Sequence, residues 1–282
     1  MTSNSRDRVL RAGVTVLGNL SVDHVDDGPA SAGGCPSFAG PALAPLGEAA
    51  MLVVRAAPAD LPLFDAVLAA VPVPWQLLPA TSTSSFSLAY SGNDRAMTVE
   101  RIGPVWTPAD VAAADVATRW VHVAPLLRSD FPAESLAALA SAGHLISYDG
   151  QGLVRVPRLG PMTTDDRYDP AVLEHVQVLN ISQDEAAELL GSLGAESVRR
   201  LGVPEVLVTR GVEGSDVYVD GVKTHVPVAW RVDDVQTTGA GDMFTVSYVV
   251  ARSQGRDPLE AAAAASTFVA EQLSLRAARH TS

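Results

Sequence analysis

The stretch VQTTGAGDMFTVSYVVARSQG (residues 235–255) is the most informative part of this sequence. A Thr-Thr-Gly-Ala-Gly turn (237–241) leads directly into a predicted helix over 240–253, and Asp242 falls in its first turn. The first N–H groups of a helix lack intrahelical partners, and the helix dipole makes that end positive. The stretch therefore suits a phosphate, or the negative charge that develops during phosphoryl transfer.

Small residues in this turn, Gly239, Ala240 and Gly241, would let a ligand approach the backbone closely. Asp242 would then be placed to accept a hydroxyl proton as that hydroxyl attacks phosphorus. A structural explanation stands beside this one, because glycine-rich turns often precede helices and Asp is favoured in a first helical turn. The sequence contains neither a GxxxxGK[ST] P-loop nor a GxGxxG dinucleotide fingerprint.

Working outward from this motif, short apolar runs alternate with helical segments along the chain. Apolar strands that alternate with helices predict an α/β fold, in which a mostly parallel central sheet carries helices on both faces. The predicted strands are 14–20, 49–56, 120–126, 144–149, 176–182 and 205–211, and the predicted helices are 38–47, 108–118, 132–142, 183–190, 195–201, 240–253 and a last helix capped by Asp257.

Two segments break the alternation. Residues 84–102 contain two strand-like runs around a Ser-Gly-Asn-Asp turn (91–94), and 215–228 contain a second hairpin that turns at Asp220-Gly221. We expect one domain over 1–282, in which residues from about 19–32 and from 84–102 form a small β lid over a site. Alternatively, both hairpins extend the edges of the sheet.

Composition excludes several classes of function. The 282 residues are 47% hydrophobic and 18% charged, with a net charge of −12 and no Lys/Arg-rich run, so we expect no nucleic-acid partner. No apolar stretch is long enough to span a membrane, and one cysteine, Cys35, suits a reducing compartment. We therefore expect a cytoplasmic protein. The histidines show no ligand spacing, so a structural metal site is not expected.

The run TTGAGD closely resembles the C-terminal signature of the PfkB/ribokinase family of carbohydrate and nucleoside kinases. Similar matches, in the family's order, extend over nearly the whole chain. They are GNLSVD (18–23), AGGCPSFAGPALAPLG (32–47), NISQDEAAELLG (180–191) and VLVTRGVEG (206–214). The resemblance implies a three-layer ribokinase-like fold, ATP and Mg²⁺ as cofactors, and a small-molecule polyol as substrate. Relatives often pair through their lids, so a homodimer is left open.

By resemblance, Asp242 would be the general base, and the amides of 239–241 would form the anion hole. Asp23 would bind substrate hydroxyls, while Gly33 and Gly34 would let the substrate lie against the backbone. The structural explanations are a solvated loop residue for Asp23 and a turn for the glycines. Glu185 would act on Mg²⁺ through its bound water.

Glu185 can equally close a capping box with Ser182. The resemblance places Thr209, Gly211 and Thr238 near the nucleotide, although Thr209 could be a buried strand residue. The segment YDGQGLVR (148–155) is similar to an Asp-x-Gln-Gly-x-x-Arg element of some members, including inositol-kinase-like ones. By that likeness Arg155 would stabilise the transferring phosphoryl group; a surface arginine is the alternative.

The chain departs from the family pattern at three positions. Phe38 stands where the family has a sugar-binding Asn, so the acceptor would be held differently from that of typical ribokinases. Ser182 replaces the Asn of the Asn-x-x-Glu motif, and Gln236 replaces an Asp linked to a monovalent-cation site.

The leading hypothesis is an ATP-dependent kinase that phosphorylates a hydroxyl of a sugar, cyclitol or nucleoside. One alternative is a catalytically inactive binding or regulatory protein of the same fold. Another is a kinase of a vitamin-like heteroaromatic alcohol, whose ring Phe38 and Trp75 could stack, although both could be core residues.

Overall fold

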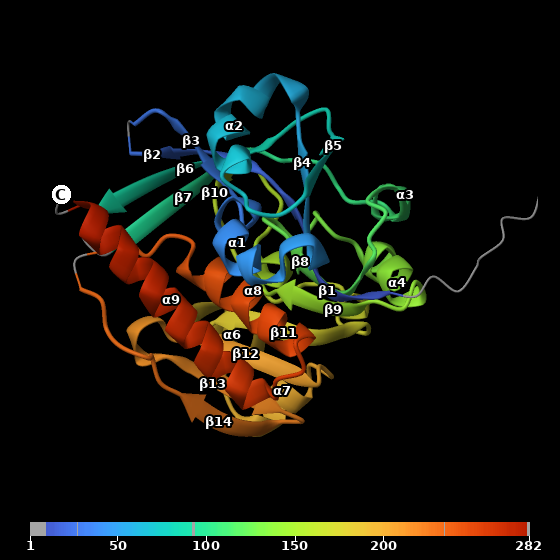
Figure 1. The fold of residues 1–282 in the computed structure, drawn as a ribbon, viewed down its shortest axis with the longest axis vertical. Helices are drawn as coiled ribbons and strands as arrows, with labels where there is room; N and C mark the ends of the chain where they lie inside the picture. Colours follow the sequence, from blue (N-terminus) through green and yellow to red (C-terminus); the bar gives the residue numbers. More distant parts are fainter. Residues whose placement is uncertain (1–9, 27, 92–93, 234, 281–282) are drawn as a thin grey trace, which may run out of the picture.

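The computed structural model describes residues 10–26, 28–91, 94–233 and 235–280, and in these residues the central feature is a nine-stranded sheet (Figure 1). The strands from β12 to β5 are all parallel, and β13 and β14 add an antiparallel edge. In spatial order they are β14 (Val222–Val226), β13 (Ser215–Val219), β12 (Glu205–Thr209), β11 (Val176–Ser182), β9 (Leu145–Asp149), β8 (Thr118–Ala124), β1 (Arg11–Asn19), β4 (Ala50–Ala56) and β5 (Trp75–Pro79).

Helices cover both faces of this sheet (Figure 1). One face packs against α1 (Pro36–Leu43), α8 (Ala240–Ser253) and α9 (Pro258–His280). The other packs against α3 (Pro108–Ala113), α4 (Ala133–Ser141), α6 (Gln183–Leu190) and α7 (Ala195–Arg199). Neighbouring strand residues such as Val16 and Leu17 enter opposite cores, which is why the strands are apolar without alternation. The predicted three-layer α/β fold is thus confirmed.

A second, five-stranded sheet lies beside the carboxyl ends of the central strands. It is made of β10 (Gly160–Pro161), β7 (Asp94–Arg101), β6 (Ser84–Ser91), β2 (Ser21–Val25) and β3 (Ala30–Gly33), in that order. Phe86, Leu88 and Val99 of this sheet pack on Leu126 and Leu127 of the main body. Both segments predicted for the lid contribute strands, and β10 adds a short strand that the sequence did not indicate.

A single residue separates β1 of the central sheet from β2 of the second sheet, because β1 ends at Asn19 and β2 begins at Ser21. This residue, Leu20, is fully buried, and its N–H donates to the carbonyl oxygen of Arg55 in β4 (3.0 Å). Strand β2 of the second sheet therefore continues the central strand β1 with almost no linker.

The hairpin predicted at 215–228 forms as β13 and β14. Its turn residues Asp220 and Gly221 both have positive φ (49° and 77°), as a two-residue type I′ turn requires. Of the turn predicted at 91–94, residues 92–93 lie outside the described residues, while Ser91 ends β6 and Asp94 begins β7. Sequence reasoning missed α2 (Leu61–Ala69) and the half-exposed strand β5, because prolines interrupt that passage.

Among the described residues, no helix combines the length and the apolarity that crossing a bilayer would demand. The short helix α5 (Gln151–Val154) directly follows β9. It lies at the carboxyl edge of the sheet, where open α/β folds place their ligands.

Candidate active site

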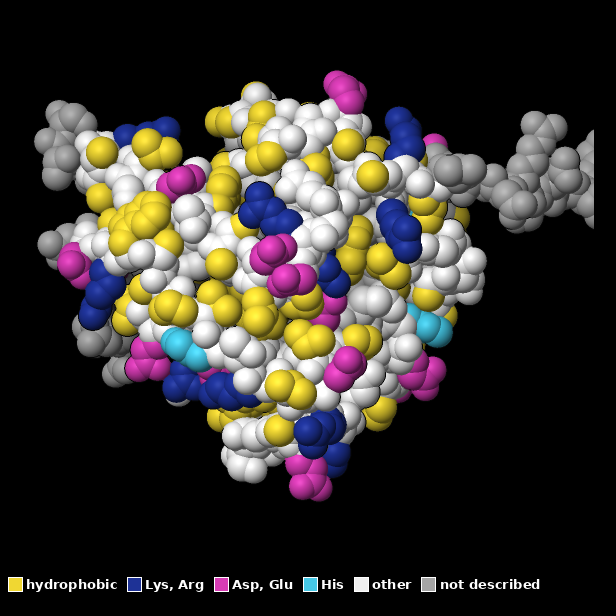
Figure 2. All heavy atoms as spheres, turned by 60° about the horizontal axis from the view of Figure 1, so that its bottom comes forward, with side chains coloured by type: hydrophobic (Ala, Val, Ile, Leu, Met, Phe, Trp, Pro, Cys, Tyr) yellow, Lys and Arg dark blue, Asp and Glu magenta, His cyan; other side chains and the backbone are white. Residues whose placement is uncertain are grey.

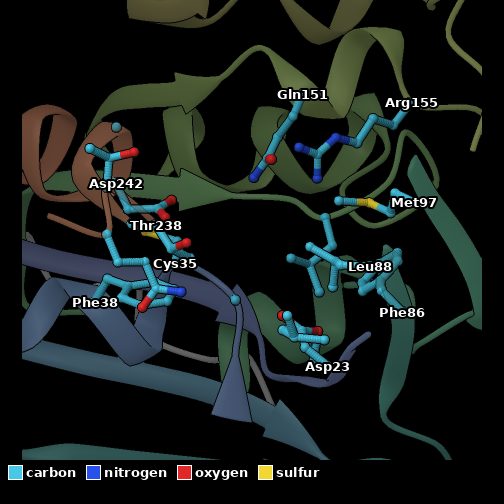
Figure 3. A pocket seen from close by; sticks show the side chains of 18 of the residues that line it. Asp23, Cys35, Phe38, Phe86, Leu88, Met97, Gln151, Arg155, Thr238 and Asp242 are labelled. Carbon is cyan, nitrogen blue, oxygen red and sulfur yellow. The ribbon is translucent and has the colours of Figure 1, made fainter. Parts of the chain in front are cut away.

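A cavity of about 790 Å³ lies between the carboxyl edge of the central sheet and the second sheet. In Figure 3 Asp242, Thr238, Cys35 and Phe38 lie on one side of it, and Asp23 lies on another. Side chains from α5 and from the second sheet complete the lining. They are Gln151, Arg155, Phe86, Leu88 and Met97. We call this space the acceptor cavity.

Asp242 occupies the third position of α8 and is partly exposed to the acceptor cavity. The turn before it depends on Gly239, which has a left-handed φ of 77°. A Cβ added to Gly239 would lie 2.4 Å from the ring of Phe38, so that ring packs directly on the turn. The position where relatives have a sugar-binding Asn thus supports the backbone beside the predicted base.

The three residues predicted for the anion site are placed differently from one another. The N–H of Ala240 donates to the carbonyl oxygen of Thr237 (2.9 Å), so this amide is used within the turn. Gly239 lines the acceptor cavity, whereas Gly241 borders that cavity and two others. Gly241 is therefore the member of the set that lies where the cavities meet.

The electrostatic environment of Asp242 favours its protonated form. Removal from solvent, and then the negative charge of Asp149, raise the pKa of Asp242 to about 7. A hydrogen bond with Cys35 and the charges of His122 and Arg155 act in the opposite direction. A carboxyl group with this proton affinity is well matched to removing a proton near neutral pH.

A second cavity, of about 150 Å³, also borders Asp242, and we call it the phosphate cavity. Its lining includes Asp149, Asn180 and Glu185. Burial raises the pKa of Glu185, and its carboxylate accepts the N–H of Ser182 (2.8 Å) in the predicted capping box. The amide oxygen of Asn180 is buried without a hydrogen-bond partner. Carboxylate and amide oxygens with spare capacity fit a hard cation such as Mg²⁺.

A third cavity, of about 310 Å³, is lined mainly by apolar side chains from α8, α9, the loop before α8 and the turn before β13. Thr209 and Gly211, both predicted near the nucleotide, line it. Thr238, predicted with them, lines the acceptor cavity instead, and its neighbour Thr237 borders both spaces. We call this space the donor cavity.

The paired glycines make room beside Asp23. A Cβ on Gly33 would lie 2.0 Å from Oδ2 of Asp23, and a Cβ on Gly34 would lie 2.6 Å from the carbonyl oxygen of Asn19. Gly34 also has a φ of 87°, which disfavours other residues. Of these residues, Asp23 and Gly34 line the acceptor cavity, while Gly33 lies behind the Asp23 carboxylate.

Arg155 follows α5 and points into the acceptor cavity beside Gln151, whose amide donates to the carbonyl oxygen of Pro125 (2.7 Å). Sequence reasoning did not propose Gln151, Asp149 or Asn180 as site residues. Asp149 and Asn180 lie on neighbouring strands at the carboxyl edge, and that position is a signal that could have found them.

Charged side chains elsewhere are mixed in sign. On the face shown in Figure 2, Lys and Arg side chains are scattered among Asp and Glu side chains. One such group surrounds the buried Asp216, which contacts Arg210 (3.2 Å), Lys223 (2.7 Å) and His225 (2.9 Å). It lies on β13, β14 and the loop before them.

Comparison with known proteins gives consistent results. The family model described as "pfkB family carbohydrate kinase" matches residues 104–281. A ribokinase from Arabidopsis thaliana is 35% identical over 115 residues, a stretch that covers 35% of this chain and 30% of that protein.

Among solved structures, a pyrophosphate-dependent kinase of the ribokinase family, complexed with a pyrophosphate analog and myo-inositol, superposes with a TM-score of 0.80. It shares 22% identity, over 93% of this chain and 95% of that one. The Arabidopsis thaliana ribokinase complexed with ribose and ATP gives a TM-score of 0.67 at 18% identity, over 93% and 92% of the two chains. At these identities the superpositions establish the fold.

Proposed function

Because this chain belongs to the pfkB family of carbohydrate kinases, we propose that it transfers the γ-phosphoryl group of ATP to a hydroxyl of a small polyol, with Asp242 as general base. The observation that carries the proposal is the position of Asp242. Its side chain lies at the start of α8 and borders both the acceptor and the phosphate cavities. A base at this junction can contact the acceptor hydroxyl on one side while phosphorus lies on the other.

In the proposed reaction the acceptor hydroxyl gives its proton to the Asp242 carboxylate as its oxygen bonds to the γ-phosphorus. The bond from that phosphorus to the bridging oxygen breaks, and ADP leaves. The start of α8 at Gly241 and the guanidinium of Arg155 stabilise the negative charge on the transferring group. When bound, Mg²⁺ would neutralise phosphate charge, held by Glu185 through water and by the oxygens of Asp149 and Asn180.

The donor cavity supports a nucleotide as donor. Apolar side chains such as Val212, Phe244 and Val269 line it, and a purine ring would gain from leaving water there. Pyrophosphate, the donor of the structural neighbour described above, has no apolar part that would use such a space. We therefore assign ATP as donor and make pyrophosphate an arm of the test.

The acceptor cavity supports a neutral acceptor. Among the described residues, its charged lining consists of three carboxyl groups, on Asp23, Asp26 and Asp242, and the guanidinium of Arg155. This balance disfavours an acceptor that already carries a phosphate.

On the lid side of the acceptor cavity, Val25, Phe86, Leu88 and Met97 form an apolar wall. A ring that turns C–H groups to this wall and hydroxyl groups to Asp23 and Gln151 would match the lining. A sugar, a cyclitol and a nucleoside all have this character.

The two alternatives make different predictions. A heteroaromatic alcohol would need a stacking ring; Phe38 lines the acceptor cavity, whereas Trp75 is on the outer strand β5 and 44% exposed. A regulatory protein would bind these ligands without turnover.

We also propose a cytoplasmic location, since Cys35 is a free thiol.

The decisive experiment measures phosphoryl transfer to a panel of sugars, cyclitols, nucleosides and heteroaromatic alcohols, with Mg²⁺ and either ATP or pyrophosphate. Asp242→Asn is compared with Asp184→Asn, the same change at an exposed first-turn position of α6. We expect ATP-dependent turnover of a polyol that falls about 10²–10⁴-fold in Asp242→Asn and is unchanged in the control. Turnover with pyrophosphate alone would refute the donor assignment, and ligand binding without turnover would favour the regulatory protein.

A further inference from the structure

Three potential metal ligands meet behind the predicted base. Cys35 precedes α1, His122 lies in β8 and Asp149 ends β9, and their ligand atoms all lie within 4.8 Å of one another. The Sγ of Cys35 is 3.8 Å from Nε2 of His122, which is 3.3 Å from Oδ2 of Asp149. Their exposed fractions are 2%, 0% and 5%. We call these residues the Cys-His-Asp cluster.

The arrangement differs from that of a cysteine nucleophile. In a nucleophilic relay the carboxylate and the thiol contact opposite nitrogens of the imidazole. Here Cys35 and Asp149 both approach Nε2 of His122, so the carboxylate does not orient the ring toward the thiol. Three donors that converge on one point are typical of ligands around a cation.

The distances fit a tetrahedral site. Bonds of about 2.3 Å to sulfur and about 2.0 Å to nitrogen and oxygen place the donors roughly 3.6 Å (N to S) and 3.3 Å (N to O) apart. The observed separations, 3.8 Å and 3.3 Å, are close to these values. The sulfur and the carboxylate oxygen lie within 4.8 Å of each other, and a tetrahedral site would bring them to about 3.5 Å.

The surroundings supply the supporting contacts that metal ligands require. Nδ1 of His122, the nitrogen away from the cluster, is 3.2 Å from Oγ of Ser147. Oδ1 of Asp149, the other carboxylate oxygen, accepts from the amide of Asn180 at 3.4 Å. Both contacts leave Nε2 and Oδ2 directed at the cluster.

Charge also favours a cation at this place. The carboxyl group of Asp149 lies beside the Sγ of Cys35, and Asp242 lines the same cavity as Cys35. Negative charge on these two groups would stabilise a divalent ion. Cys35 lines the acceptor cavity and Asp149 lines the phosphate cavity, which gives an ion a route from either side.

We propose that Cys35, His122 and Asp149 bind a soft divalent cation with tetrahedral preference, such as Zn²⁺, and that this ion inhibits the kinase by holding Asp242 as its fourth ligand. On binding, the thiol releases its proton to solvent and a metal–sulfur bond forms, with no change of oxidation state. Mg²⁺ avoids thiolate ligands, so it would not bind this set of three donors, although it would share Asp149 with the ion proposed here. The proposed inhibition rests on the proposed function, whereas the proposed metal binding does not.

Metal binding is tested with Co²⁺ as a spectroscopic substitute for Zn²⁺, on the full chain with its thiol kept reduced. The sequence has a single cysteine, so a thiolate-to-Co²⁺ charge-transfer band can come from Cys35 alone. We expect such a band, saturating at one equivalent and displaced by Zn²⁺. It should be absent in Cys35→Ser, weakened about 100-fold or more in His122→Gln, and retained in His225→Gln, a change at a histidine on β14.

The wild-type spectrum shows whether the thiolate binds the metal, even if a variant fails to fold. No charge-transfer band in wild type at saturating Co²⁺ would overturn the proposal. A band that persists unchanged in folded His122→Gln would also overturn it, because the thiol would then bind metal without the cluster.

Inhibition is measured separately, with Zn²⁺ added to the working kinase in excess Mg²⁺ and removed by a zinc-selective chelator. We expect reversible loss of turnover over the concentration range in which Zn²⁺ displaces Co²⁺. Metal binding without loss of turnover would overturn the proposal that the ion inhibits the kinase. A charge-transfer band in a protein that shows no kinase activity would support the metal site while the proposed function fails.

Discussion

Gly33→Ala should damage acceptor binding through Asp23. The added Cβ would lie 2.0 Å from Oδ2 of Asp23, 2.4 Å from its Cγ and 2.6 Å from Oγ of Ser21. Normal van der Waals contact begins near 3.4 Å, so the carboxylate must retreat by more than about 1 Å. Gly33 has no left-handed φ, and the change therefore acts through this contact and adds no backbone strain.

A displacement of about 1 Å in a group that positions substrate can cost about 10²-fold in rate. We therefore expect kcat/KM for the acceptor to fall about 100-fold, equivalent to about 2.7 kcal/mol, while KM for the donor is unchanged. The donor cavity, lined by residues such as Gly211, is separate from Asp23. Overpacking should also lower the stability by about 1–3 kcal/mol.

Steady-state kinetics with each substrate varied in turn checks this, in Gly33→Ala, Asp23→Ala and the double variant. If the glycine acts through the carboxylate, the two losses are strongly non-additive. Gly194→Ala is the matched control, because its Cβ would meet nothing closer than Oγ of Ser197 at 4.0 Å. Additive losses, or an equal rise in KM for the donor, would refute the reasoning.

Three further outcomes are expected. Val212→Asp, at an exposed edge of the donor cavity, should raise KM for ATP about 10-fold and leave any pyrophosphate-dependent turnover unchanged. Burial raises the pKa of Asp130 to about 6, so the folded state binds the proton more tightly than the unfolded state and loses stability as pH rises from about 4 to 6. In urea titrations the free energy of unfolding of Asp130→Asn should therefore exceed that of wild type by up to about 3 kcal/mol at pH 7, and by less at pH 4. An equal difference at both pH values would contradict this. Arg252→Ala removes the guanidinium that lies 2.6 Å from the carboxylate of the buried Glu205. The free energy of unfolding should fall by about 3 kcal/mol in the same titrations, and no fall would show that the pair does not stabilise the fold.

The elements that follow from local pattern were predictable. Apolar strands such as 176–182 are buried on both faces, so composition alone identifies them. Helices with clear start signals, α6 at Ser182 and α9 at Asp257, also form where those signals place them. The half-exposed strand β5 is neither buried on both faces nor marked by a start signal, and the prolines in and before it do not indicate a strand.

The candidate site was predictable where one short motif contains it. Asp242 and Gly241 lie in a contiguous run, and the structure places both at the meeting point of the cavities. The detailed use of that run was not predictable, because the Ala240 amide bonds within the turn and Thr238 faces the acceptor cavity. His122 looked like an ordinary strand residue, since its neighbours in the site come from distant parts of the chain.

The one-residue junction at Leu20 has a mechanical consequence. A flap on a long linker can open without disturbing the body to which it is attached. Here strand β2 of the second sheet continues β1, and the junction is fixed by the burial of Leu20 and by its hydrogen bond to Arg55. A tilt of the second sheet about Leu20 would therefore twist β1, which pairs with β8 on one side and β4 on the other. A ligand in the acceptor cavity that moves the second sheet would thereby strain the pairing of these three central strands.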